Sequence, residues 1–234
     1  MCIRDRVWLK APQGPTPSIL IKGYIENQLP LEAERAFILQ LQDDSISGQK
    51  SHIMTTIAQS YMLRQDLQNA KRLFGEVVKR EARDAKSRNS LAAIFMKEGN
   101  TMEAKRLWLE ACQLEPGFSS PRFNLGKQLM KEQRTSEAMA LFLEYHALEP
   151  EDPDGHNYLS MGYLRAKQFG KAEIHLSRLI ELRPDDGVAY TNLAKVYLAL
   201  RNLSAARDIV ARGLQAEGID PRSRQTLQQM SERF

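Results

Sequence analysis

A chain of 234 residues, of which 42% are apolar and 26% charged, is long enough to bury a sizeable core and has the composition of a globular protein. Its net charge of +4 is too small to indicate a nucleic-acid-binding surface, which usually carries a concentrated basic stripe. Two cysteines, Cys2 and Cys112, make neither a disulfide framework nor a zinc site. No apolar run approaches the roughly 18–20 residues that a membrane span needs, and residues 1–10 lack the apolar segment of a signal peptide.

The first residues differ from the rest of the chain. We expect residues 1–13 to be a leader, because MCIRDR resembles translated adaptor sequence and the prolines between Pro12 and Pro17 prevent regular structure. A native protein that begins further upstream explains such a start, and the chain would then be truncated at its N-terminus. An ordinary disordered terminus is the alternative.

From about residue 14 onward the sequence repeats itself. Alanines recur every 34 residues, at Ala70, Ala104, Ala138, Ala172 and Ala206. Ala33 precedes this series by 37 residues, which indicates three inserted residues near position 48–50. A leucine or isoleucine followed by a small residue, two series of large apolar residues, and three prolines run in step with the alanines.

Residues 91–116 show what one repeat contains. Two stretches with apolar residues at helical spacing flank Gly99, which predicts a turn between two helices. Asn100 or Thr101 is the expected N-cap of the second helix. Trp108 lies on the apolar face of that helix, so we expect it in the core. A single hairpin cannot bury such a face alone, and the repeats supply the neighbours that it needs.

The pattern resembles the tetratricopeptide repeat, in which a leucine and a small residue, an aromatic, an alanine, a second aromatic and a proline recur at a period of 34 residues. This resemblance covers about residues 14–220 and implies an all-α fold, a right-handed superhelical array of antiparallel helical hairpins. We expect six repeats, at residues 14–47, 51–84, 85–118, 119–152, 153–186 and 187–220. Aspartates ahead of the hairpins, such as Asp152 and Asp186, are expected to cap helices and not to catalyse.

The last repeat departs from the pattern at two glycines. Gly213 replaces the usual small or apolar residue, and Gly218 stands where a proline is expected. Residues 221–234 then show one more helical pattern, with Leu227, Met230 and Phe234 on one face. We expect a C-terminal capping helix that covers the final hairpin, as stacked repeats require. Four polar residues of this helix are expected to face outward: Arg222, Arg224, Gln228 and Glu232.

Motifs of catalysis and cofactor binding are absent from the sequence. There is no GxGxxG, P-loop, HExxH or GxSxG pattern, so we predict no enzymatic activity and no cofactor. The four histidines lie far apart in the chain, and we expect them on different faces, without a metal site: His52, His146, His156 and His175.

The helix face that the repeats leave free is the expected binding surface. Stacked hairpins form a concave groove, and we expect the first helix of each hairpin to line it. The side chains predicted to line this groove mix basic, amide and apolar groups: Gln59, Lys86, Asn89, Phe123, Lys127, Lys131, Asn157, Met161, Arg165, Thr191 and Lys195, with Leu63 and Leu198 beside them. Amides can bond to the backbone of an extended peptide, and lysines can pair with its carboxylates. A solvated helix face is the alternative interpretation.

The sequence therefore predicts a non-catalytic scaffold that binds a protein or an extended peptide, and the lysines favour a partner of acidic character. The alternative is a regulatory or targeting region of a larger enzyme, or of a membrane-anchored envelope protein whose N-terminal part is missing. RNA binding is a third hypothesis, which the small net charge disfavours. The expected compartment is the cytoplasm, whereas a missing N-terminal segment would place the protein at the envelope or in the periplasm.

Overall fold

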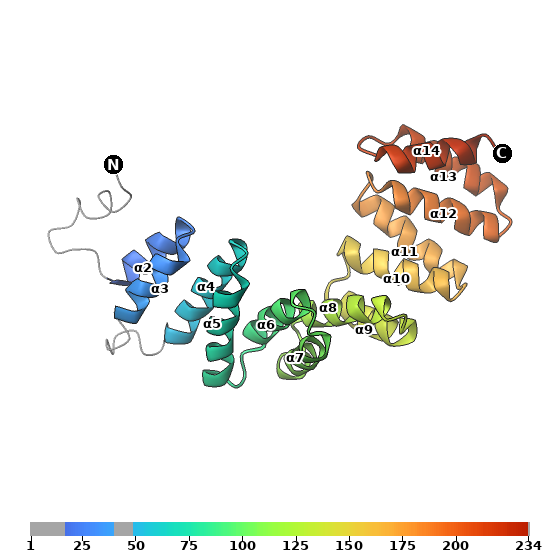
Figure 1. The fold of residues 1–234 in the computed structure, drawn as a ribbon. Helices are drawn as coiled ribbons and strands as arrows, with labels where there is room; N and C mark the ends of the chain where they lie inside the picture. The colour runs from blue at the N-terminus through green and yellow to red at the C-terminus, as the bar shows by residue number, and fades with distance from the viewer. Residues whose placement is uncertain (1–16, 40–48, 234) are drawn as a thin grey trace, which may run out of the picture. The chain divides into compact units, whose positions relative to one another are not determined.

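The computed structural model describes residues 17–39 and 49–233, which form thirteen α-helices and no strand (Figure 1). Consecutive helices pack in pairs, so the all-α fold of helical hairpins is confirmed. The chain divides into two compact units, a first unit up to Phe118 and a second unit from Ser119. The predicted leader, residues 1–13, lies outside the described residues.

Each unit is a stack of hairpins that follow one another in chain order. The first unit holds α2 (Pro17–Glu26) with α3 (Pro30–Leu39), α4 (Lys50–Leu63) with α5 (Leu67–Arg80), and α6 (Ala85–Lys97) with α7 (Thr101–Leu114). The second unit holds α8 (Ser119–Lys131) with α9 (Thr135–Leu148), α10 (Pro153–Arg165) with α11 (Phe169–Leu182), α12 (Gly187–Ala199) with α13 (Leu203–Gln215), and α14 (Pro221–Ser231). The exact limits of the six repeats stay a prediction.

Every hairpin turn contains one residue with a left-handed backbone conformation. These residues have φ between 55° and 82° and, from the second onward, are spaced 34 residues apart: Gln28, Gln65, Gly99, Gln133, Lys167 and Arg201. The following N–H closes the turn, as where Asn100 N donates to the Phe95 carbonyl at 2.8 Å. The predicted turn at Gly99 is confirmed, and the N-cap is Asn100, whose Oδ1 accepts from Glu103 N at 3.3 Å.

Small residues lie where the two helices of a hairpin approach each other most closely, as the alanine series predicts. Ala104 and Ala138 have no exposed surface. A Cβ added to Gly126 would lie 2.9 Å from the Phe142 ring, so these helices leave no room for a side chain there. Trp108 is 3% exposed, which confirms its place in the core.

Aspartates begin several of the hairpins, as predicted. The carboxylates of Asp152 and Asp186 accept hydrogen bonds of 3.0 Å from the backbone of Gly155 and Ala189, in the first turns of α10 and α12. Asp84 caps α6 in the same way. These carboxylates satisfy N–H groups that the helix leaves without partners, so their role is structural.

Helix α14 closes the second unit by packing on α12 and α13. Leu227 is fully buried in the core of the last hairpin, and Met230 packs against that core, as predicted. The expectation that Arg224 faces outward is wrong. Its guanidinium reaches back to α13 and donates to the carbonyls of Leu214 and Ala216 at 2.8 and 3.1 Å, which completes the open end of that helix.

Candidate functional site

The predicted binding face in the second unit carries cations that the fold does not use. Lys131 on α8, Arg165 on α10 and Lys195 on α12 are all exposed. The side chain of none of the three makes a hydrogen bond or an ion pair with any part of the chain that the structure describes. Their charges therefore remain available to a partner.

Other residues of the predicted face take part in packing. Phe123 is half-buried, and its ring centroid lies 4.8 Å from that of Tyr145 and 5.4 Å from that of Tyr158. The ammonium of Lys127 lies 5.0 Å from the centroid of Phe123, within cation–π range. Phe123 is thus mainly a core residue, and Lys127 covers a face of its ring.

Asn157 and Met161 lie on α10 and are half-buried, so part of each side chain can still contact a partner. Thr191 is different, because it is only 7% exposed. Its hydroxyl donates to the Gly187 carbonyl of its own helix at 2.9 Å. Thr191 leaves little surface for a partner, and we omit it from the proposed surface.

In the first unit the predicted face is smaller. Gln59 on α4 and Lys86 on α6 are exposed, whereas Asn89 is half-buried. Leu63, at the end of α4, is 73% exposed and gives this face an apolar component. The ammonium group of Lys86 makes no hydrogen bond or ion pair with the described residues.

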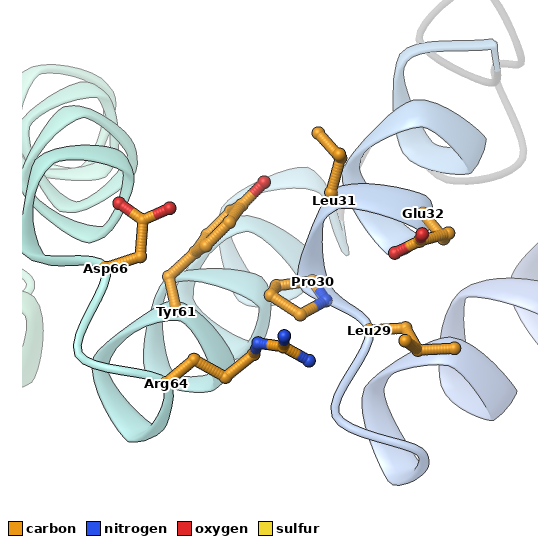
Figure 2. Close-up of a pocket in the computed structure, with 7 residues that line it drawn as sticks. All are labelled: Leu29, Pro30, Leu31, Glu32, Tyr61, Arg64 and Asp66. Atoms are coloured by element: carbon orange, nitrogen blue, oxygen red, sulfur yellow. The ribbon is translucent and has the colours of Figure 1, made fainter.

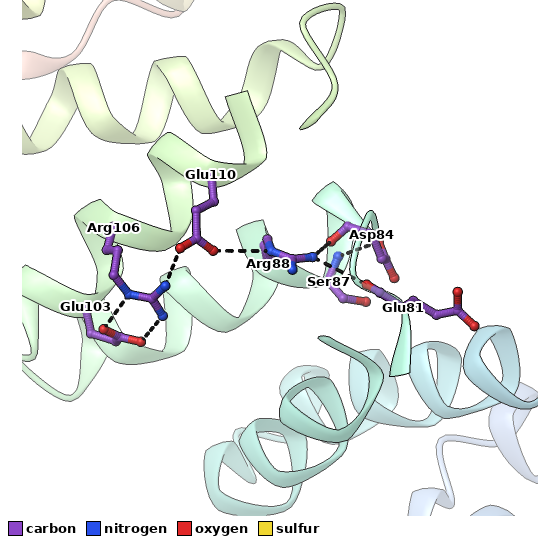
Figure 3. Close-up of polar contacts among 7 residues, drawn as sticks. All are labelled: Glu81, Asp84, Ser87, Arg88, Glu103, Arg106 and Glu110. Carbon is purple, nitrogen blue, oxygen red and sulfur yellow. Dashed lines mark hydrogen bonds and ion pairs between the residues drawn. The ribbon is translucent and has the colours of Figure 1, made fainter. Parts of the chain in front are cut away.

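Two other cations of the first unit, Arg88 and Arg106, are held by carboxylates, as Figure 3 shows. Arg106 on α7 lies between Glu103, at 2.5 Å, and Glu110. Arg88 on α6 reaches the same Glu110 at 3.3 Å and donates to the Asp84 carbonyl at 3.1 Å. The hydrogen bond to Arg106 lowers the pKa of Glu103 below its usual value. Because every charge here is compensated within the fold, this network links α6 to α7 and is not a binding site.

A cavity of about 390 Å³ lies beside the turns of the first two hairpins and was not predicted. Figure 2 shows its lining residues: Leu29, Pro30, Leu31, Glu32, Tyr61, Arg64 and Asp66. Arg64 is already bonded to the Gln28 carbonyl at 2.7 Å. Behind the cavity, the Tyr61 hydroxyl donates to Glu34 at 2.9 Å, and Glu34 also accepts from Arg72 at 2.5 Å.

Glu34 is 7% exposed, and its two partners compensate its buried charge. Burial and the hydrogen bond to Glu34 raise the pKa of Tyr61 well above the usual tyrosine value. Tyr61 is therefore a fixed hydrogen-bond donor that ties α4 to α3. We interpret this group as part of the packing between hairpins.

The prediction that the histidines lie on different faces is wrong for three of them. His146 of α9, His156 of α10 and His175 of α11 gather with ring centroids 4.8 to 5.4 Å apart. Tyr163 stacks on His175 with 5.5 Å between the centroids. The cluster could not be predicted from the sequence, because the packing of adjacent helices brings together histidines that are 10 and 19 residues apart in the chain. Among the described residues no three His, Cys, Asp or Glu side chains are placed to hold a metal ion.

Stacked hairpins with a 34-residue period and small residues at the helix crossings define a helical-repeat protein of the α-solenoid class. Residues 163–230 match the tetratricopeptide repeat family. This part of the chain therefore carries the tetratricopeptide repeat, and the other described hairpins have the fold of a helical-repeat array.

Solved structures with the same fold include YrrB, a TPR protein, with a TM-score of 0.67 at 14% sequence identity over 83% of this chain and 98% of that chain. MamA from Desulfovibrio magneticus RS-1 has a TM-score of 0.61 at 16% identity, over 70% of this chain and 93% of that chain. A tetratricopeptide repeat protein from Parabacteroides merdae ATCC 43184 has a TM-score of 0.64 at 13% identity, over 93% and 86%. At these identities the likeness concerns the fold.

No curated protein sequence is similar enough to this chain to count as a relative. None of the helices in residues 17–39 and 49–233 is long and apolar enough to cross a lipid bilayer.

Proposed function

We propose that this protein is a non-catalytic scaffold that binds a protein or an extended peptide through the first helices of its hairpins. The observation that carries the proposal is the set of free cations on that face. Lys131, Arg165 and Lys195 are exposed and lack carboxylate partners among the described residues, whereas Arg106 and Arg178 on second helices are paired.

The difference between unpaired cations on the first helices and paired cations on the second helices matters more for function than for stability. Exposed ion pairs contribute about 0–1 kcal/mol each, so leaving these cations unpaired costs the fold little. Unpaired cations on one face attract a partner of opposite charge and orient it. The half-buried Asn157 adds an amide that can bond to a peptide backbone, and Met161 adds an adaptable apolar contact.

The hairpin scaffold supports this mechanism. Lys131, Arg165 and Lys195 lie on hairpins whose second helices carry the fully buried Ala138, Ala172 and Ala206 at the crossing, so the surface exists before the partner arrives. A preformed surface loses little conformational entropy on binding. The fold neighbour YrrB is described as having an unusual peptide-binding site, which supports a peptide partner for this chain by analogy. A role as the regulatory region of a larger protein stays a prediction.

The test compares two charge-reversed forms of the whole chain. Lys131→Glu with Arg165→Glu changes the proposed face, and Lys167→Glu with Arg201→Glu makes the same charge change in the exposed hairpin turns of the same unit. Proteins captured by the immobilised wild-type chain are quantified by mass spectrometry after nuclease treatment. Equal helical content and melting temperature establish that both variants are folded.

We expect the face variant to lose specific partners by about tenfold, and the turn variant to retain them. Equal capture by both variants would contradict the assignment of the face. Capture that disappears with nuclease treatment would show RNA binding instead.

A further inference from the structure

A cavity of about 280 Å³ lies between α12 and α14 in the second unit. One side comes from the last hairpin and the other from the terminal helix and the residue pair that follows it. Its lining residues are Lys195, Leu198, Thr226, Gln229, Met230 and Arg233. The sequence placed only the first two of these on a binding face and assigned the terminal helix to capping.

Two of the lining side chains are cations that have no carboxylate partner among the described residues. Lys195 and Arg233 are exposed, and the side chain of neither makes a hydrogen bond or an ion pair with any residue that the structure describes. No carboxylate is among the described residues that line the cavity. A cleft lined by charges of one sign concentrates its electric field and raises the local concentration of the opposite charge. The cavity is therefore suited to an anion.

The same cavity has an apolar part. Leu198 is 41% exposed, although it lies on the helix that carries the core of the last hairpin. Met230 is half-buried, and packs against that core from α14. An exposed leucine beside a methionine offers contact to an apolar side chain, because a thioether adapts to different shapes.

Polar groups complete the lining. Gln229 is exposed and has no hydrogen-bond partner among the described residues, so its amide can both donate and accept. The Thr226 hydroxyl donates to the Arg222 carbonyl at 2.9 Å, which leaves its oxygen free to accept. These are the groups that an extended backbone can use.

The size of the cavity narrows the class of ligand. Cavities for cofactors and drug-sized molecules usually span about 300–1,000 Å³ and enclose most of the ligand. At about 280 Å³ this cavity suits one or two side chains of a longer chain that runs across it.

We propose that the groove formed by Lys195, Leu198, Met230 and Arg233 binds an acidic peptide segment of a partner protein, in which a carboxylate lies beside an apolar side chain. This inference rests on the proposed function and makes it specific. The terminal helix α14 then contributes half of a binding site, in addition to covering the last hairpin.

The experiment measures fluorescence anisotropy of the whole chain with a fluorescein-labelled peptide that alternates aspartate, leucine and serine. The matched peptide has asparagine in place of each aspartate. The variants are Lys195→Glu, Arg233→Glu and Leu198→Asp. Arg222→Glu is the control, because it changes an exposed cation on the same helix that does not line the groove. Light scattering reports the oligomeric state of each variant.

We expect the aspartate peptide to bind about tenfold more tightly than the asparagine peptide, and raising the salt from about 50 to about 200 mM to weaken it. Each groove variant should lose about tenfold in affinity, while Arg222→Glu should keep wild-type affinity. Equal affinity of Arg233→Glu and Arg222→Glu would overturn the groove assignment. Self-association through this face, removed by Arg233→Glu, would overturn it as well.

The two proposals fail in different ways. If partner capture depends on Lys131 and Arg165 while the groove variants change neither capture nor peptide affinity, the groove is wrong and the scaffold function stands. If the wild-type chain captures no protein and binds neither peptide, the scaffold function itself is wrong.

Discussion

His156 Nδ1 lies 3.0 Å from His175 Nδ1, at hydrogen-bond distance, where α10 and α11 pack together. The other ring nitrogen of His156 lies 3.0 Å from the Pro150 carbonyl, so it must carry a proton and donate. In the neutral cluster His175 therefore donates to His156. His146 Nδ1 is buried and has no hydrogen-bond partner within the described residues. Three imidazoles thus share one site, and burial there lowers the pKa of His156 and of His175, which favours the neutral form of both.

This cluster predicts that acid destabilises the second unit. Burial, then the neighbouring His156 and His146, lower the pKa of His175 from 6.5 to about 4, and burial also lowers the pKa of His156. Above 6.5 these rings are neutral in both states. As the pH falls from 6.5 toward 4 the unfolded chain takes up protons first, so the free energy of unfolding decreases. We expect His175 to account for roughly 2–3 kcal/mol, less than the about 3.4 kcal/mol that a change in pKa from 6.5 to about 4 represents, because solvent screens the charge of this half-buried ring.

Two charged groups near the histidine cluster act on the pKa of His156 in opposite directions. Arg178 on α11 opposes protonation of His156, and Glu151, which is paired with Arg178, favours it. Urea unfolding between these pH values is the measurement. His175→Phe should flatten the pH dependence of the free energy of unfolding, because phenylalanine does not titrate. The phenylalanine ring can still stack on Tyr163, so the packing is kept. His52→Phe, in the exposed part of α4, should leave the pH dependence unchanged. An unchanged slope in His175→Phe would refute the prediction.

The close packing of α14 on Gly187 and Gly213 predicts that substitution of either glycine by alanine lowers the stability of the second unit. A Cβ added to Gly187 would lie 2.4 Å from Ser223 Cβ, and one added to Gly213 would lie 2.9 Å from Leu227 Cδ1. Gly187→Ala and Gly213→Ala should each destabilise the second unit by about 1–3 kcal/mol through overpacking. Hydrogen exchange should accelerate first in α14. Gly170→Ala, where the added Cβ meets nothing within 4 Å, should be neutral or slightly stabilising. Equal rates of hydrogen exchange in α14 for all three variants would contradict the close packing of α14 on these glycines.

The second helix of the α10–α11 hairpin lacks a capping side chain. Gln168 occupies the N-cap position of α11 and makes no cap hydrogen bond, whereas Asp66 and Asn202 at the equivalent positions each accept one. Gln168→Asp should raise the free energy of unfolding by about 0.5–2 kcal/mol, because its carboxylate can accept from the first turn. Thermal unfolding checks this, with Gln168→Ala as the control that should bring no gain. A melting temperature for Gln168→Asp no higher than that of Gln168→Ala would exclude the effect.

The buried carboxylate of Glu34 predicts how the first two hairpins hold together. Tyr61→Phe removes the hydroxyl that donates to Glu34 at 2.9 Å and leaves a buried carboxylate with Arg72 as its remaining partner. We expect a loss of about 1.5–3 kcal/mol, typical of a hydrogen bond to a charged group. Hydrogen exchange in α3 and α4 should accelerate. Tyr24→Phe in α2 is the matched control, and an equal response in both variants would mean that the hydroxyl is unimportant.

Much of the local structure was predictable from the sequence. The alanine period located the hairpins, Gly99 and Asn100 located a turn and its cap, and the spacing of Trp108 placed it in the core. These features depend on residues within one or two turns of a helix, so the spacing in the chain contains the information. The candidate binding face was predicted as a set of positions, and its use by a partner stays a prediction.

What the sequence by itself determined was the class of fold: helical hairpins, their caps and the residues that close their crossings. Only the tertiary structure decided which side chains of neighbouring helices meet. It gathered His146, His156 and His175, turned Arg224 back to α13, and placed Arg233 at a cavity with Lys195. The physical reason is that periodicity fixes the face of a helix on which a residue lies, whereas the crossing of two helices fixes what that residue touches.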